Sequence, residues 1–195
     1  VGALALAAAL LHCFNHTLFK GGLFLGVGSI HHGTHTRNME ELGGLIKRMP
    51  VTAVFFLGCS LSISAIVPFN GFVGEWLIYQ SIFASISSSN ATLNILYIIS
   101  VAVLALSGAL AAACFIKLFG ISFLGLPRSE HAAHAKEVSA SMNVGTGILA
   151  SLCLITGLIP LLPLSLLSRV IASITGNGVV GQLNGGFLMA WYPLK

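Results

Sequence analysis

The chain has 195 residues, of which 56% are hydrophobic and 7% are charged, whereas soluble domains carry about 25% charged residues. Its formal net charge of +4 comes from scattered lysines and arginines, and no basic run interleaved with aromatic residues indicates a nucleic-acid partner. This composition excludes an ordinary soluble domain. It predicts an all-α integral membrane protein, a multi-span helical bundle in which residues 1–195 form a single membrane domain.

Polar stretches divide the chain into four apolar regions, each long enough to cross the roughly 30 Å of hydrocarbon in a bilayer. The second region, residues 51–87, is too long for one straight helix and contains the sequence VPFNGF in its middle. It therefore forms either one interrupted helix or two separate spans. The predicted helices cover residues 2–30, 51–67 with 72–87, 93–124 and 142–168, and residues 178–195 are left as an uncertain tail.

The first apolar region carries three ionisable side chains at four-residue steps, His12, His16 and Lys20. Residues four apart lie nearly above one another on a helix, so these groups form a ladder about 12 Å long. A charge at membrane depth costs about 3 kcal/mol or more and usually marks a functional site. The pattern predicts a proton or ion path, although interhelical hydrogen bonding without transport would also place histidines here. The spacing suits two zinc ligands, but the sequence offers no third, so no metal site is expected.

The interruption of the second region centres on a proline. Pro68 lacks a backbone donor and disfavours helix at Val67, and Asn70 and Gly71 tolerate turn geometry. A single interrupted span places the basic inter-helix loops on one side of the membrane, as the positive-inside rule favours, whereas two full spans would split them. The basic residues concerned are Arg37, Lys47, Arg48, Arg128 and Lys136. We predict one discontinuous helix broken near Pro68–Gly71, with the basic loops cytoplasmic.

Glu75 lies about one turn after the predicted break. Irregular backbone at membrane depth is stable only beside protein or a water-filled cavity. This favours a buried relay between the Glu75 carboxylate and the ladder. Alternatively, Glu75 caps the second half-helix through the helix dipole. Histidine exchanges protons near neutral pH, while desolvation favours a neutral lysine and a nearby carboxylate favours a charged one. Lys20 would then be a switchable proton store, His16 and His12 the relay, and Glu75 the partner that holds or releases the charge.

The polar stretches between the helices hold five more histidines. Such residues can bind metal or collect protons, but side chains in polar loops are usually solvated. We therefore interpret them as solvated loop residues, namely His31, His32, His35, His131 and His134.

Four segments of the chain carry a family resemblance. They are LHCFNHTLFKGGLFLGVGSI, MEELGGLIKRMPVTA, PFNGFVGEWLIYQSIF and ACFIKLFGISFLGLPR. In this order they resemble the large antiporter-like membrane subunit of group 4 hydrogenases, of the formate hydrogenlyase and hydrogenase-4 component B type, which is related to the antiporter-like subunits of complex I and of Mrp antiporters. The resemblance spans about residues 8–128 and implies that the chain is a fragment, the middle-to-late part of a larger subunit.

The resemblance carries the family's His-x-x-x-His-x-x-x-Lys motif onto the ladder of the first helix, and the charged residue of the interrupted helix onto Glu75. It also matches Lys117 to a basic position in the next helix, although Lys117 lies near the loop at Pro127, where a lysine can snorkel to the interface. Proton relay residues are thus expected at His12, His16, Lys20, Glu75 and Lys117. Nothing in the chain resembles the quinone-, nickel–iron- or iron–sulfur-binding subunits, so it is expected to hold no cofactor and no catalytic residue.

These features predict a subunit that moves protons across the membrane through a His/Lys/Glu relay, within a membrane-bound hydrogenase or complex I-like redox complex whose catalysis belongs to other subunits. The expected partners are further membrane subunits, peripheral redox subunits, the lipid bilayer, and protons or sodium ions. The expected location is the prokaryotic cytoplasmic membrane. Two alternatives remain, an Mrp-type sodium/proton antiporter subunit and a structural membrane anchor whose polar residues serve helix packing.

Overall fold

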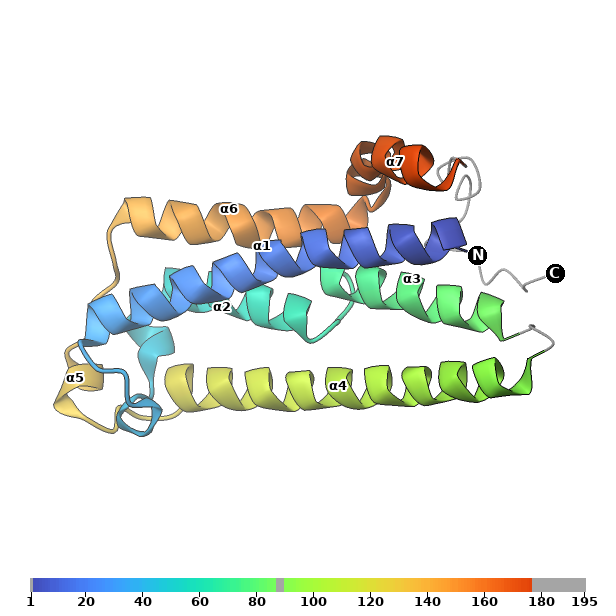
Figure 1. The fold of residues 1–195 in the computed structure, drawn as a ribbon. Coiled ribbons are helices and arrows are strands. Elements are labelled where there is room, and N and C mark those ends of the chain that lie inside the picture. The colour runs from blue at the N-terminus through green and yellow to red at the C-terminus, as the bar shows by residue number, and fades with distance from the viewer. Residues whose placement is uncertain (1, 87–89, 177–195) are drawn as a thin grey trace.

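The computed structural model describes residues 2–86 and 90–176, which form helices and loops and no strand. Figure 1 shows the longer helices packed side by side as a bundle, and this confirms the all-helical membrane fold. The longer helices are α1 (Gly2–Thr34), α2 (Pro50–Ile63), α3 (Asn70–Ser85), α4 (Ala91–Phe123), α6 (Ala140–Leu158) and α7 (Leu161–Thr175). Short helical turns lie in the loops, namely η1 (Met39–Glu41), η2 (Leu45–Lys47) and α5 (Glu130–Ala133).

Three of the described helices, α1, α4 and α6, are individually long and apolar enough to cross a membrane. α1 and α4 each have 33 residues, a length of about 50 Å at the usual helical rise. α1 lies in the middle and packs against α2, α3, α6 and α7, while α4 lies along α2 and α3 (Figure 1). Large aromatic side chains from α1, α2 and α4 form part of the core, since Phe19, Phe56 and Phe123 are at most 2% exposed.

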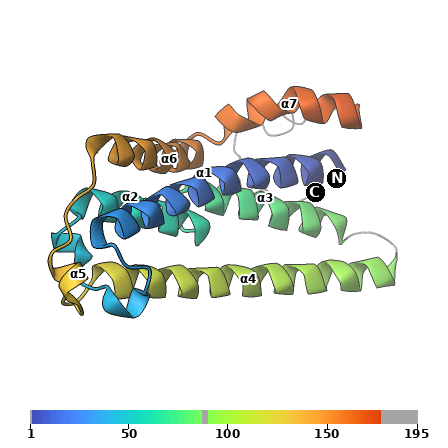
Figure 2. The ribbon, with the colours of Figure 1, turned by 60° about the vertical axis from the view of Figure 1, so that its left-hand side comes forward.

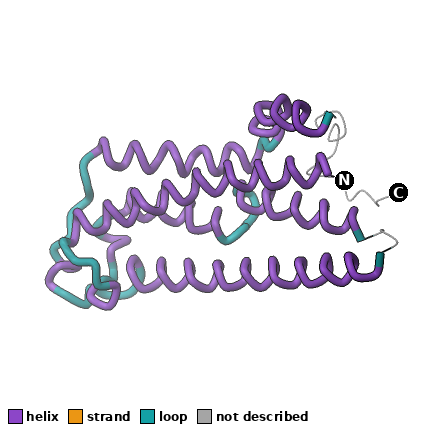
Figure 3. Tube along the Cα trace, in the orientation of Figure 1, coloured by secondary structure: helices purple, strands orange, loops and turns teal. Residues whose placement is uncertain are grey.

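The predicted discontinuous helix is confirmed. α2 and α3 run one after the other in the same direction, joined by an irregular turn (Figure 3). The break covers residues 64–69 and therefore lies earlier than expected: α2 stops short of residue 67, and Asn70 and Gly71 begin α3 instead of forming the turn. The physical reason is Ala65, which adopts a left-handed conformation with φ of 53° and so ends α2 before the proline is reached.

The backbone of the break is partly satisfied by its own hydrogen bonds. Unpaired backbone groups at membrane depth are costly, so this pairing stabilises an irregular turn whose residues 66–68 are exposed on the surface of the described chain. α6 covers the turn closely, because a Cβ at Gly157 would overlap the carbonyl oxygen of Pro68. In the break, the backbone N–H of Ala65 donates to the carbonyl oxygen of Ser62 (3.1 Å), that of Ile66 to Leu61 (3.1 Å) and that of Phe69 to Ile66 (3.0 Å).

The single helix predicted over residues 142–168 is wrong, because two helices, α6 and α7, occupy this stretch. Pro160 has no backbone N–H and disfavours a helical conformation at Ile159, so α6 ends before it and the chain turns. α7 then packs through Leu164 and Ile171 against the start of α1. It is foreshortened in Figure 1 and seen lengthwise in Figure 2.

The other predicted bounds differ from the observed ones by a few residues. α4 begins slightly earlier than predicted because Asn90 caps it: the Asn90 Oδ1 accepts the backbone N–H groups of Thr92 at 3.0 Å and Leu93 at 3.3 Å. Residue 87 and the uncertain tail, 178–195, lie outside the described residues.

The two loops that carry basic residues lie at the same end of the bundle, while α3 ends and α4 begins at the opposite end (Figure 2). This is the arrangement that one interrupted span predicts. That the basic end faces the cytoplasm stays a prediction.

Candidate ion path

α1 places the polar ladder beside α3 and α4. His12 packs against α3 at Gly74, where a Cβ would lie 3.1 Å from the His12 Nδ1. This nitrogen is buried and makes no hydrogen bond to any described residue. The ring centroids of His12 and His16 are 6.4 Å apart, so the two imidazoles are neighbours without a direct hydrogen bond. His16 is exposed on the surface of the described chain.

Lys20 continues the ladder toward α4. Its Nζ lies 5.9 Å from the centroid of the Phe115 ring, and the face of an aromatic ring attracts a cation. The described residues contain one ion pair, which joins Glu130 and His134 in a loop, so Lys20 has no carboxylate partner in this conformation.

Glu75 is half-buried on α3 and also faces α4. A Cβ built on Gly108 would lie 3.4 Å from the Glu75 Oε2. Glu75 does not contact Lys20, because their contact points on α4, Gly108 and Phe115, are seven residues apart, about 10 Å along the helix. The face-to-face lysine and glutamate that the sequence suggests is therefore not formed.

Four of the five expected residues lie along α1 and the part of α3 that packs against it, and we call these four residues the row. The row begins at Glu75 on α3: the residue before it, Gly74, packs against His12, while the Glu75 carboxylate itself faces α4 at Gly108. From His12 the row continues along α1 to His16 and then to Lys20. Ionisable residues of α1 and α3 thus lie on both sides of the contact between Gly74 and His12.

Lys117 is the fifth expected residue, and it lies apart from the row. It follows Phe115 by two positions on α4, and two positions turn a helix by about 200°. Its side chain is exposed and points away from the face of α4 that meets Lys20.

A buried polar network at the crossing of α1 with the break is not apparent from the sequence. The Asn15 Nδ2 donates to the carbonyl oxygen of Asn70 at 2.9 Å, and the Asn70 Nδ2 donates to the Asn15 Oδ1 at 3.1 Å. The Ser62 hydroxyl donates to the Asn70 Oδ1. All three residues are at most 1% exposed. The signal that could have found this network is an asparagine in mid-helix, between the two ladder histidines.

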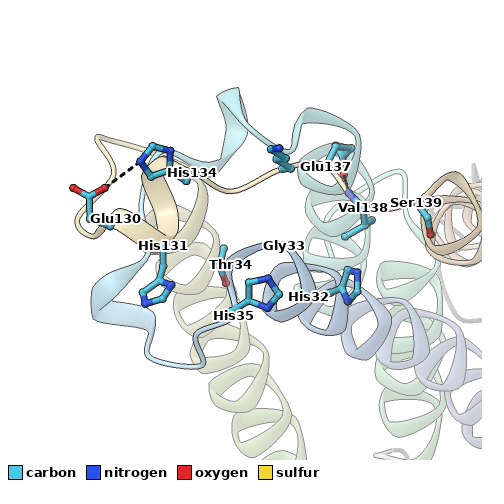
Figure 4. A pocket seen from close by; sticks show the side chains of 11 residues that line it. His32, Gly33, Thr34, His35, Glu130, His131, His134, Glu137, Val138 and Ser139 are labelled. Carbon is cyan, nitrogen blue, oxygen red and sulfur yellow. Dashed lines mark hydrogen bonds and ion pairs between the residues drawn. The ribbon is translucent and has the colours of Figure 1, made fainter.

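A cavity of about 560 Å³ lies at the loop end of the bundle, between the end of α1 and the segment around α5 (Figure 4). The His134 Nε2 pairs with Glu130 over 3.1 Å at its rim, and both side chains are more than 80% exposed. No group of three His, Cys, Asp or Glu side chains among the described residues is arranged to hold a metal ion. The lining histidines, all exposed, are His32, His35, His131 and His134.

Glu137, in the loop before α6, caps the start of α2. Its carboxylate accepts the backbone N–H of Val51 at 2.9 Å, the backbone N–H of Thr52 at 3.4 Å and the Thr52 hydroxyl at 2.6 Å. Partial burial by itself raises the pKa of Glu137, but hydrogen bonds from Thr52, Asn143 and the α2 backbone outweigh it and hold that pKa below its ordinary value. The loop is thereby tied to the first half of the interrupted helix.

Comparisons with known proteins agree on the family. The family model described as "NADH:quinone oxidoreductase/Mrp antiporter, TM" matches residues 1–105. The chain is 47% identical to hydrogenase-4 component B of Escherichia coli (strain K12) over 153 residues, which cover 78% of this chain and 23% of that protein. It is 42% identical to formate hydrogenlyase subunit 3 of the same strain over 155 residues, 80% of this chain and 26% of that protein.

The fold is similar to one solved in the structure of the Mrp complex from Dietzia sp. DQ12-45-1b, with a TM-score of 0.75 and 21% identity, over 95% of this chain and 41% of that one. The chain spans about a quarter of the length of the two curated relatives. The family resemblance inferred from the sequence motifs is confirmed. The chain is an antiporter-like integral membrane segment and belongs to the NADH:quinone oxidoreductase/Mrp antiporter family.

Proposed function

We propose that the chain is the part of an antiporter-like subunit that moves protons across the membrane, coupled to redox chemistry in other subunits of a hydrogenase or complex I-like complex. The observation that carries this proposal is the ladder of His12, His16 and Lys20 on α1, with His12 packed against α3 at the residue before Glu75. Ionisable groups at membrane depth are costly and mark proton and ion pathways. The names of the two curated relatives support a hydrogenase complex as the setting.

In the proposed relay, the carboxylate of Glu75 exchanges a proton with His12, whose Nδ1 has no described partner. His12 and His16 are too far apart for direct transfer, so a bridging water connects them. Lys20 stores the proton at the far end of the row, where its Nζ lies 5.9 Å from the centroid of the Phe115 ring. Because Lys20 and Glu75 do not meet, each controls the other through the histidines.

Lys117 has a separate role in this proposal. Its exposed position near the loop end of α4 suits a lysine that snorkels to the membrane interface. The surface of α4 is otherwise strongly apolar, with Leu106 61% and Leu110 62% exposed. Further membrane subunits or segments and lipid would cover this surface, and peripheral redox subunits would bind outside the bilayer of the prokaryotic cytoplasmic membrane.

The test is proton translocation by the full-length subunit within its complex in sealed vesicles. Lys20→Met and Glu75→Gln are each expected to reduce translocation to the level of uncoupled vesicles while the complex still assembles. Matched controls are Lys136→Met and Glu130→Gln, which change an exposed loop lysine and glutamate, and these should retain translocation. Undiminished translocation in the Lys20 and Glu75 variants would refute the relay and leave a structural anchor.

Sodium/proton exchange is the second candidate function, favoured by the Mrp antiporter in the family description. The same vesicles distinguish it from proton translocation. Proton movement that needs external sodium, accompanied by sodium uptake that Glu75→Gln abolishes, would favour exchange. Proton movement that is unchanged when potassium replaces sodium would favour the relay.

A further inference from the structure

The amides of Asn15 and Asn70 and the hydroxyl of Ser62 fit together in one arrangement. The Asn15 Nδ2 donates to a backbone carbonyl, so its Oδ1 is free to accept the Asn70 Nδ2. This leaves the Asn70 Oδ1 to accept the Ser62 hydroxyl. Turning either amide over would set donor against donor or acceptor against acceptor. The network therefore defines a single relative position for α1, the end of α2 and the start of α3.

Close helix packing makes these bonds possible. At Gly74 a Cβ would lie 3.1 Å from the His12 Nδ1 and 3.2 Å from the Asn15 Nδ2, and at Gly71 a Cβ would overlap the carbonyl oxygen of Ser62. The two glycines let α3 approach both α1 and the end of α2. Because the three polar side chains are fully enclosed, no water is at hand to replace a broken bond, and separating them leaves buried polar groups unpaired.

The network lies directly beside the proposed relay. Glu75 follows Asn70 by five residues, about 7.5 Å along α3, and His12 lies one turn from Asn15 on α1. A helix transmits the position of its first turn to the next, so anchoring Asn70 fixes the height and direction of the Glu75 side chain. Sliding α3 by a single residue would turn Glu75 by about 100° and remove it from the face that meets α4.

We propose that Asn15, Asn70 and Ser62 are positioning residues that hold the interrupted helix in register with α1, so that Gly74 stays against His12 and Glu75 keeps its place against α4. This inference rests on the proposed relay and adds residues that do not themselves carry protons. Tyr79, one turn further along α3, interacts electrostatically with Glu75, Gly108 of α4 lies against the Glu75 carboxylate, and His12 of α1 packs against the preceding residue, Gly74. A displaced Glu75 therefore meets a different set of proton partners.

The experiment measures the proton translocation rate per assembled complex as a function of pH, with the full-length subunit in sealed vesicles. Asn15→Leu fills a similar volume and removes both amide bonds, and we expect the rate to fall roughly tenfold or more, as for other small misplacements of reacting groups. Its pH profile should shift as well. Ser62→Ala removes one bond and should shift the profile in the same direction by less. The control is Ser29→Ala, because Ser29 is a buried serine of α1 whose hydroxyl donates to the carbonyl oxygen of Leu25 in its own helix.

A network that serves only folding would reduce the amount of assembled complex and leave the rate per complex and its pH profile unchanged. That result in Asn15→Leu would overturn the inference. If Asn15→Leu does not assemble, Ser62→Ala decides, since a shifted profile supports the positioning role and an unshifted profile overturns it. Lys20→Met and Glu75→Gln are measured in the same series. Full translocation by these two variants would refute the relay itself. If they are inactive while the Asn15 and Ser62 variants keep the natural rate and pH profile, only the positioning role is refuted.

Discussion

Replacing Glu137 with glutamine is expected to loosen the start of the interrupted helix. The glutamine would keep the shape of the side chain but offer one acceptor oxygen in place of two, so either the Val51 N–H or the Thr52 hydroxyl would face an amide nitrogen. A hydrogen bond to a charged group contributes about 1.5–3 kcal/mol, and a charge at a helix N-terminus adds about 0.3–1 kcal/mol. Because the site is partly exposed, water replaces part of the lost hydrogen bonding. We therefore expect the free energy of unfolding to fall by about 2 kcal/mol.

The pH dependence of this loss follows from the lowered pKa of Glu137. A carboxylate whose pKa is lower in the folded state stabilises the fold above its unfolded pKa, and this stabilisation is lost as the pH falls through the folded value. The difference in stability between the natural protein and Glu137→Gln should therefore be constant near pH 7 and shrink below about pH 4.5. This difference in stability is measured by thermal unfolding of the full-length protein in detergent, followed by circular dichroism at several pH values.

Glu130→Gln is the matched control, because Glu130 lies in the same loop with its side chain 89% exposed and, among the described residues, forms an ion pair with His134 alone. Exposed pairs of this kind contribute little. Equal effects of the two substitutions, or a Glu137→Gln effect that persists unchanged at pH 3.5, would show that the carboxylate does not hold α2 in the way described.

Two further pairs of glycine variants test the packing around the break and the relay. Gly157→Ala would push a methyl group into the carbonyl oxygen of the break and should cost about 1–3 kcal/mol in thermal unfolding, whereas at Gly145 the nearest atom to a new Cβ is 3.8 Å away and alanine should be neutral or stabilising. Gly108→Leu should fill the space over the Glu75 carboxylate and block proton translocation in vesicles, whereas Gly120→Leu, in open space on the same helix, should not. Equal behaviour within either pair would contradict the packing on which it rests.

The sequence predicts well the features that depend on residues close together in the chain. The four-residue spacing of His12, His16 and Lys20 needs only helix geometry, and the interruption by Pro68 needs only backbone chemistry. The first and last residues of the interruption are harder to predict, because the left-handed Ala65 ends α2 early. The same proline rule, applied at Pro160, would have divided the last predicted helix.

Contacts between distant parts of the chain could not be predicted from the sequence in the same way. Asn15 and Asn70 are 55 positions apart, and Val51 and Glu137 are 86 apart. A single asparagine or glutamate in a sequence does not say which backbone group it will meet after folding. The position of Glu75 relative to Lys20 belongs to this class, because it depends on how α3 crosses α1 and not on the position of either residue in its own helix.

The distance between Lys20 and Glu75 has a physical consequence for transport. A direct ion pair buried in the bundle would hold both groups charged, because neutralising one would leave the other unpaired in an apolar environment. With about 10 Å between their contact points on α4, either group can change its protonation state without that penalty. In the proposed relay, the two histidines pass the proton between them. A row of four groups is therefore better suited to proton passage than the face-to-face pair of charges that the sequence suggested.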